Sequence, residues 1–339
     1  MTPIPRPNFS HLLSLSGPLG THEHAEYARA RVEHGFCTDD VARVLLVASR
    51  EPQPCESLRS LALSSMDFLE GAQEDDGTFR NRRDGLGKWF GPSTSDDCWG
   101  RSLWALGTVI ARCDDEELRQ RAVALFERGA PVRSPWPRAV AFAVLGASEV
   151  IASERSCEGA RELVEAAVVV LDRPDVGAEW TWPEPRLAYA NAVLPEALLA
   201  MGSVLMDQRL TTAGLRQLQW LLARETNDGH LSVTPAGGSG DGERTNGFDQ
   251  QPIEVAAMSD ACLRAYDVSG DRTWLAGHEL ALRWFLGGND KGTPMFDPWT
   301  GGGYDGLTAT GPNLNQGAES TLALLSTLQN ARRFVVAAT

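Results

Sequence analysis

Hydrophobic residues recur at helical spacing along almost the whole chain, as Val41, Leu45 and Ala48 do near its start. Polar stretches, and stretches rich in Gly and Pro, separate these segments. Outside the loops, no alternation of polar and apolar residues is long enough for a substantial strand. After a first helix around 41–48, the pattern predicts helices at about 57–72, 97–112, 115–129, 137–153, 157–172, 188–206, 210–224, 252–268, 272–286 and 316–332.

The two helices of each predicted pair differ in polarity. Residues 101–111 are apolar on nearly all sides, whereas residues 115–127 carry one apolar and one charged face. A helix that is apolar all round must be buried, and an amphipathic helix lies at the surface. The alternation therefore predicts an all-α fold, an (α/α)6 toroid of inner and outer helices, in a single domain over residues 1–339. The segment 22–33 is the expected partner of the last helix and would close the ring.

The connections between these helices are of two kinds. Links from an inner to an outer helix are short, whereas most links back to the next inner helix are long and rich in Gly, Pro and Trp. Long irregular loops in a compact fold are usually functional. They all lie where the inner helices begin, so the site is expected at that end of the ring. Two of them contain an Asp-Gly pair, at 76–77 and 228–229, which predicts a short hairpin in each.

Each predicted inner helix begins with polar residues, although it is otherwise apolar. Thr38, Ser95 and Asp39 are good N-caps, and acidic residues suit the first turn of a helix, so a structural role is one interpretation. Capping needs only one acceptor, however, and two of these helices carry Asp-Asp pairs. Parallel inner helices would bring these carboxylates to one mouth, where their pKa values can separate as general acid/base catalysis requires. The candidate catalytic residues are Asp40, Asp97, Glu254 and Glu319.

Other residues near these helix starts are candidates for holding a substrate. Arginines there can pair with carboxylates or with the substrate. The chain has ten Trp against four Tyr, and we expect two or three Trp of the mouth loops to stack on sugar rings. The candidate substrate-binding residues are His34, Asp39, Asp96, Trp99, Arg101, Trp136, Arg138, Trp182, Asn191, Gln251 and Asp305.

Composition restricts the partners. The formal charge of −14, without a cluster of Lys and Arg, argues against a nucleic-acid ligand. The N-terminal segment has no apolar run long enough for a signal peptide or a membrane span, so a cytoplasmic protein is expected. None of the six Cys forms a Cys-x-x-Cys pair, and we expect reduced thiols and no metal or other cofactor. The Gly-rich segment 301–306 lacks the Lys of a phosphate-binding loop. The oligomeric state is left open.

Four blocks of the sequence resemble a known group. The segments 35–43 (GFCTDDVAR), 95–107 (SDDCWGRSLWALG), 248–254 (FDQQPIE) and 313–322 (NLNQGAESTL) are similar to poorly characterised bacterial proteins described as glycosidase-related, which accompany glycosyltransferases. More broadly, residues 33–328 look like the six-hairpin, or (α/α)6-toroid, glycosidase superfamily. That resemblance implies the toroid fold and a carbohydrate substrate, with hydrolysis the commonest activity and with lyases, phosphorylases and epimerases as relatives.

Four functions follow as hypotheses. The leading one is a glycoside hydrolase that cleaves an oligosaccharide, with inversion favoured because carboxylates on opposing inner helices leave room for a water, at roughly 6.5–9.5 Å. A sugar epimerase or isomerase would need a base such as His34 or His230. A terpene-type cyclase would use an Asp-Asp acid, but Cys37 stands where a further Asp is usual, and the mouth is polar. A non-catalytic sugar-binding module would depend on Trp rather than on carboxylates.

Overall fold

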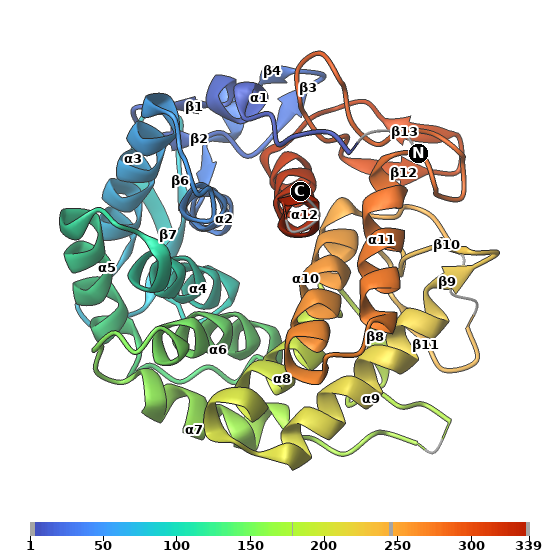
Figure 1. Cartoon of the computed structure of the whole chain (residues 1–339). Coiled ribbons are helices and arrows are strands. Elements are labelled where there is room, and N and C mark those ends of the chain that lie inside the picture. The colour runs from blue at the N-terminus through green and yellow to red at the C-terminus, as the bar shows by residue number, and fades with distance from the viewer. Residues whose placement is uncertain (1–3, 178, 244–246, 337–339) are drawn as a thin grey trace.

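The computed structural model describes residues 4–177, 179–243 and 247–336, and its helices form two concentric rings (Figure 1). The inner ring consists of α2 (Thr38–Ser49), α4 (Asp97–Arg112), α6 (Pro137–Ala152), α8 (Val193–Leu205), α10 (Pro252–Ser269) and α12 (Ala318–Val336). The outer ring consists of α1 (Ser10–Ser14), α3 (Glu56–Ala72), α5 (Glu116–Gly129), α7 (Ala160–Leu171), α9 (Gln208–Arg224) and α11 (Thr273–Phe285). The predicted (α/α)6 toroid is confirmed.

The ring closes through a different segment from the one predicted. The short helix α1 packs against α12 and α3, whereas residues 22–33 lie across the start of α12. Within that segment β3 (Ala25–Glu26) pairs with β4 (Arg29–Ala30), and the 3-10 helix η1 (Val32–His34) follows. The amides of Gln316 and Ala318 donate to carbonyl oxygens of this segment and hold it there. The prediction that residues 22–33 form the outer partner of the last helix was therefore wrong, since α1 holds that place in the outer ring.

Neighbouring inner helices approach closely where glycines face them. A Cβ atom on Gly107 of α4 would lie 2.4 Å from the carbonyl oxygen of Gly146 on α6, and one on Gly146 would lie 2.2 Å from that of Leu103. Both distances are shorter than any side chain allows. Glycine at these positions lets the two backbones touch, which explains why the apolar inner helices contain residues that are otherwise poor helix formers.

The short strands lie in the loops between helices. The longest, β6 (Phe79–Arg83) and β7 (Trp89–Thr94), join β5 (Phe36–Cys37) in an antiparallel sheet beside the start of α2. Both predicted Asp-Gly turns are confirmed. Gly77 and Gly229 adopt φ values of 84° and 80°, and β9 (Thr226–Asn227) pairs with β10 (His230–Leu231) across the second turn. The remaining two-residue or three-residue strands are β1 (Ser16–Gly17), β2 (Gly20–Thr21), β8 (Arg186–Leu187), β11 (Ser239–Gly240), β12 (Gly306–Thr308) and β13 (Gly311–Asn313).

Most helix boundaries match the prediction, but α8 begins five residues later than the expected 188. The side chain of Asn191 accepts the N–H of Ala188 at 2.9 Å, and the amides of Ala190 and Asn191 donate to Glu254 on α10. These bonds hold the segment before α8 as a turn. All six cysteines are free thiols. Within the described part of the chain, no helix is long and apolar enough to cross a membrane.

Candidate active site

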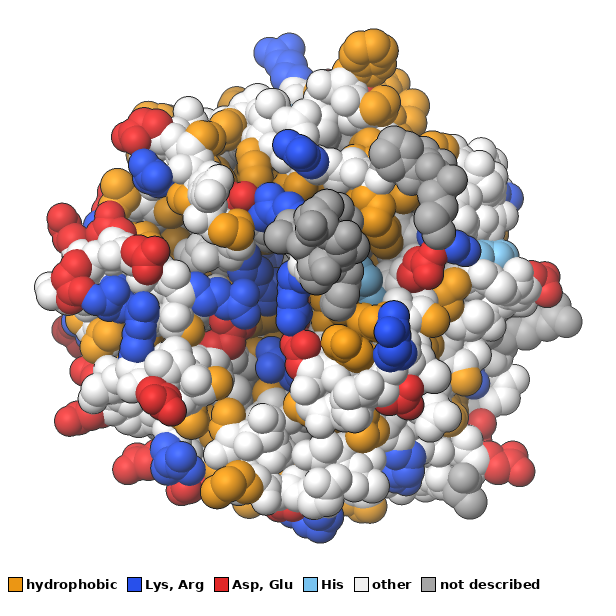
Figure 2. All heavy atoms as spheres, viewed as in Figure 1, with side chains coloured by type: hydrophobic (Ala, Val, Ile, Leu, Met, Phe, Trp, Pro, Cys, Tyr) orange, Lys and Arg blue, Asp and Glu red, His pale blue; other side chains and the backbone are white. Residues whose placement is uncertain are grey.

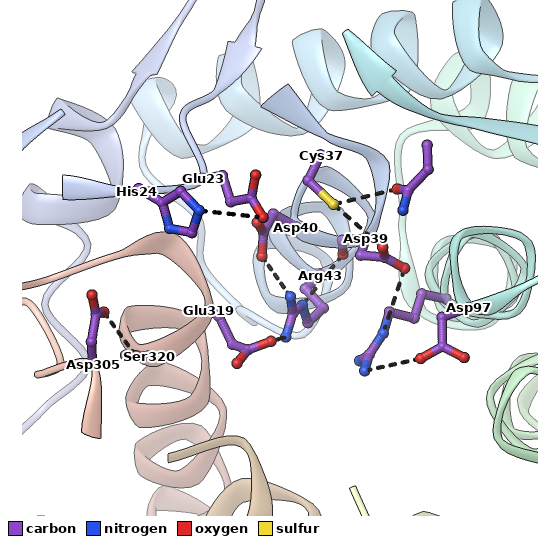
Figure 3. Close-up of polar contacts among 12 residues, drawn as sticks. Glu23, His24, Cys37, Asp39, Asp40, Arg43, Asp97, Asp305, Glu319 and Ser320 are labelled. Atoms are coloured by element: carbon purple, nitrogen blue, oxygen red, sulfur yellow. Dashed lines mark hydrogen bonds and ion pairs between the residues drawn. The ribbon is translucent and has the colours of Figure 1, made fainter. Parts of the chain in front are cut away.

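A cavity of about 440 Å³ opens at the end of the ring where the inner helices begin. We call it the mouth cavity. Its charged lining consists of six carboxylates, Glu23, Asp39, Asp40, Asp97, Asp305 and Glu319, and three arginines, Arg43, Arg82 and Arg101. Figure 3 shows how most of these side chains converge from α2, α4, α12 and the N-terminal segment. The excess of carboxylates makes the cavity unfavourable for an anionic ligand.

The carboxylates at the starts of α2 and α4 do not cap these helices. The N-cap positions belong to Cys37 and Asp96, and neither side chain makes a capping hydrogen bond to an amide of its helix. The Thr38 hydroxyl donates instead to the carbonyl oxygen of Arg80. Outer helices α5 and α9, by contrast, are capped by Asp115 and Asp207. The capping interpretation therefore does not account for Asp39, Asp40 or Asp97, and these carboxylates are available to the cavity.

Arg43 links two of the carboxylates. Its Nη2 donates to Asp40 Oδ1 at 2.5 Å, and its Nη1 donates to Glu319 Oε2 at 2.7 Å. The side chain of Asp40 is only 3% exposed, whereas that of Glu319 is 40% exposed. Burial raises the pKa of Asp40 to about 7 despite Arg43. Burial also acts to raise the pKa of Glu319, but the Arg43 guanidinium outweighs it and holds that pKa below its usual value. Glu319 is thus an ionised carboxylate at neutral pH.

Arg101 lies between two further carboxylates of the cavity, those of Asp39 and Asp97. Its Nε is 3.7 Å from Asp39 Oδ1, and its Nη2 is 3.7 Å from Asp97 Oδ2, while its guanidinium stacks 4.0 Å above the ring of Phe142. Asp39 Oδ1 is buried and has no hydrogen-bond partner among the described residues. Burial raises the pKa of Asp97, against Arg101 and against the Tyr189 hydroxyl, which donates to Asp97 at 3.1 Å. Asp97 and Glu319 therefore have pKa values displaced in opposite directions.

The N-terminal segment supplies residues that the sequence reasoning missed. Glu23 pairs with Arg82, and His24 lies 3.7 Å from Glu23 at the edge of the cavity. Opposite, Asp305 accepts from the amide of Gly317 at 2.7 Å and from the Ser320 hydroxyl. No periodic pattern marks Glu23 or His24, because both lie in a segment that reaches the mouth only through backbone bonds to the start of α12.

Three predicted site residues lie behind the cavity rather than in it. Glu254 is buried on α10, and both its oxygens accept from the amides of Ala190 and Asn191. Arg138 donates to Asn191 Oδ1 at 3.1 Å and to the carbonyl oxygen of Tyr189, whose ring it also faces. Burial raises the pKa of Glu254 to about 7. This network holds Tyr189 at the cavity wall, so Arg138, Asn191 and Glu254 reach the cavity only through Tyr189.

The expected tryptophan platform is absent from the described lining of the cavity. Trp99 is fully buried and donates to the carbonyl oxygen of Gly129, and Trp182 is buried against Trp220. Trp136 precedes α6 and is 57% exposed, but it lies outside the cavity. Of the other predicted residues, Gln251 lines the cavity, whereas Asp96 and His34 do not. Tyr189 is the aromatic residue of the lining that offers a ring to a ligand.

One group of side chains has donor atoms close enough to surround a cation. Single ligand atoms of Glu23, Cys37 and Asp40 lie within 4.8 Å of one another. Burial raises the pKa of the Cys37 thiol well above its usual value, and this thiol donates to Asp39 Oδ2 at 3.3 Å. Since Glu23 and Asp40 are also bonded to Arg82 and Arg43, all three side chains already have partners, and the group does not favour a metal ion.

Comparisons with known proteins bear on the fold. No family model and no curated protein sequence matches the chain. A sugar epimerase from a ruminal bacterium superposes with a TM-score of 0.73 at 13% identity over 95% of each chain. Cellobiose 2-epimerase from Spirochaeta thermophila superposes with a TM-score of 0.69 at 13% identity, over 96% of this chain and 93% of the other. A cellulase of C. cellulolyticum superposes with a TM-score of 0.61 at 11% identity, over 93% of this chain and 88% of the cellulase. The chain thus has the (α/α)6-toroid fold of sugar epimerases and glycoside hydrolases.

Proposed function

We propose that this chain is a carbohydrate-active enzyme, most simply a glycoside hydrolase, with Asp97 as general acid and Glu319 as general base. The observation that carries the proposal is that both carboxylates line one cavity in different surroundings: Glu319 is bonded to Arg43 at 2.7 Å, which lowers its pKa, whereas burial raises the pKa of Asp97. A protonated carboxyl can protonate the leaving oxygen, and an ionised carboxylate can activate a water. Asp97 and Glu319 lie on α4 and α12, with α2 between these helices. We expect inversion, which needs a separation that admits a water between the two carboxyls.

The substrate class follows from the same lining. Carboxylates outnumber arginines, which disfavours uronic acids and sugar phosphates and favours a neutral oligosaccharide. Hydroxyl groups can donate to Asp39 and Asp305 and accept from Arg101, which suits vicinal diols. Tyr189 offers an aromatic ring beside the acid, and Gln251 adds an amide. These residues would orient the sugar, while Asp40 acts through Arg43 on Glu319.

Sugar epimerisation is the second candidate. It requires a base that removes a proton from carbon, and His24 is the imidazole that lines the described cavity. The two histidines expected from the sequence are not in this lining. The ring of His34 packs edge-on against that of His24, with 5.1 Å between the centroids, and His230 pairs with Asp290 at 3.0 Å. Two of the superposed structures are epimerases. A terpene-type cyclase is disfavoured, because the apolar space below the carboxylates measures only about 60 Å³.

One experiment separates these functions. The purified chain is incubated with a panel of neutral oligosaccharides in D₂O, and the products are followed by proton NMR. Hydrolysis shortens the chains and first releases one anomer, the inverted one. Epimerisation leaves chain length unchanged and introduces deuterium at carbon 2 of the reducing sugar. Binding without either change would refute both catalytic proposals and favour a sugar-binding module.

A further inference from the structure

A second cavity, of about 610 Å³, lies at the opposite end of the ring, where the inner helices end. We call it the floor cavity. Figure 2 views this end and shows basic and acidic side chains gathered around a central hollow. Every inner helix or its C-cap contributes a polar residue to the lining, and together these residues are Arg50, Arg112, Glu149, Glu196, Arg264 and Asn330. The volume is in the usual range of small-molecule sites.

Ion pairs around this cavity use only part of each side chain. Arg264 Nε donates to Glu196 Oε1 at 3.0 Å, and Arg112 Nε donates to Glu149 Oε2 at 2.9 Å. Arg50 reaches Asp260 through Nη1 alone, at 3.4 Å. The side chains of Arg50, Glu149 and Glu196 are 9%, 7% and 3% exposed. A charged group in such a position is stabilised only when its remaining donors and acceptors are also satisfied.

Several of those remaining atoms have no partner among the described residues. They are Arg50 Nε, Glu149 Oε1, Glu196 Oε2, Gln329 Oε1 and the hydroxyl of Ser148, and all belong to residues that line the floor cavity. An unsatisfied buried polar atom costs about 1–3 kcal/mol, and more when the group is charged. A water or a bound molecule that supplied the missing hydrogen bonds would therefore stabilise this end of the ring.

Their chemistry restricts the occupant. An anion would meet the free oxygens of Glu149 and Glu196, and a cation would meet the free N–H of Arg50. Five arginines and four carboxylates line the cavity, so neither sign of charge is strongly favoured. A neutral molecule with several hydroxyl groups both donates and accepts, and it suits a set that contains four acceptor oxygens and one N–H donor. We propose that the floor cavity is a binding site for a monosaccharide or a similar polyol.

This site is separate from the mouth cavity. A narrow apolar space of about 60 Å³, lined by Trp104, Phe142 and Leu322 among others, lies between the two. Glu196 and Asp260 line both this space and the floor cavity, whereas Arg43 and Glu319 line both this space and the mouth cavity. A sugar ring does not pass so small a space. Occupancy of the floor cavity therefore does not depend on the chemistry proposed for the mouth.

The test uses the full chain with D-glucose, myo-inositol and inorganic phosphate as probes, by titration calorimetry and by soaking crystals. Glucose or inositol is expected in the floor cavity, bonded to Glu149 and Glu196. Glu149→Gln should weaken this binding by about tenfold or more, because a charged acceptor is lost. Ser148→Ala, which leaves every ion pair in place, should weaken it less. Asp97→Asn in the mouth should leave this binding unchanged.

Three outcomes would overturn the proposal: density for separate waters only, phosphate bound at this place instead of the polyols, or polyol binding that neither floor variant alters. Glu149→Gln should also leave the reaction at the mouth unchanged. Failure of the floor site and failure of the proposed hydrolase are distinguishable, since the first is read from binding and the second from products.

Discussion

Replacing Arg43 by Gln tests how the buried carboxylates of the mouth are stabilised. The guanidinium is bonded to Asp40 and to Glu319, and its side chain is 12% exposed. Glutamine removes the charge but keeps a hydrogen-bonding side chain. We expect the variant to fold, and to lose stability by an amount that depends on pH.

The magnitude follows from the pKa of Asp40, which burial raises to about 7 from 3.8. Between these values the native state holds a proton that the unfolded state has released, so the free energy of unfolding falls as the pH rises. Above pH 7 the free energy of unfolding of the wild type no longer falls, because Asp40 ionises in the native state and Arg43 stabilises the ionised form. In Arg43→Gln the carboxyl stays protonated, and stability continues to fall by about 1.4 kcal/mol per pH unit. Half-exposed Glu319 adds a loss of about 1 kcal/mol or less that varies little above pH 5.

The assay is urea unfolding followed by circular dichroism between pH 5 and pH 8.5. The variant should be less stable than wild type by about 1 kcal/mol at pH 6 and by about 3 kcal/mol at pH 8.5. Arg59→Gln is the matched control, because Arg59 pairs with Glu56 on the surface, where side chains are 62% and 86% exposed. It should change stability by less than about 0.5 kcal/mol at every pH. A loss from Arg43→Gln that is the same at all pH values would refute the reasoning.

Three further predictions concern stability and pH. Burial raises the pKa of Glu225 to about 8, so the native state keeps this proton between about pH 4.5 and pH 8, and stability falls across that window as the pH rises. Glu225→Gln should therefore make the melting temperature fall less steeply with pH, and an unchanged slope would contradict this. Gly146→Ala should lower the free energy of unfolding, measured in urea, by about 1–3 kcal/mol, because the new Cβ would collide with the backbone of α4. Helix propensity alone predicts the opposite, a gain of about 1 kcal/mol. Gly237→Ala, which meets nothing within 4 Å, is its control and should be near neutral. Tyr189→Phe removes a donor that lowers the pKa of Asp97, so the basic limb of the kcat/KM profile should move to higher pH. A shift to lower pH would exclude Asp97 as the acid.

The fold could be predicted because the ring repeats one pattern. Apolar inner helices and amphipathic outer helices alternate, and the bounds 97–112 of α4 follow directly from this local signal. The start of α8 could not be predicted in this way, because the turn before it is held by Glu254, which is 63 residues away from Asn191 in the sequence. Helix α1 has five residues, too few for a periodic signal, so the partner of α12 was assigned to the wrong segment.

The candidate site was predictable in part for the same reason. First-turn residues of α2, α4 and α12 converge because their helices are parallel, which brings Asp40, Asp97 and Glu319 to the mouth cavity. The position of a side chain within the first turn decides whether it reaches the cavity or the neighbouring loop, and Glu254 reaches the loop. Glu23 belongs to no inner helix and so carries no such signal.

The roles of Asp97 and Glu319 are the central claim, and the rates of two variants test it most directly. On an oligosaccharide that the wild type cleaves, kcat/KM is measured for Asp97→Asn and Glu319→Gln, with circular dichroism to confirm folding. Each variant should lose about 10²–10⁴-fold, as expected when a general acid or base is removed. Rates within tenfold of wild type for both variants, with the fold retained, would contradict the account.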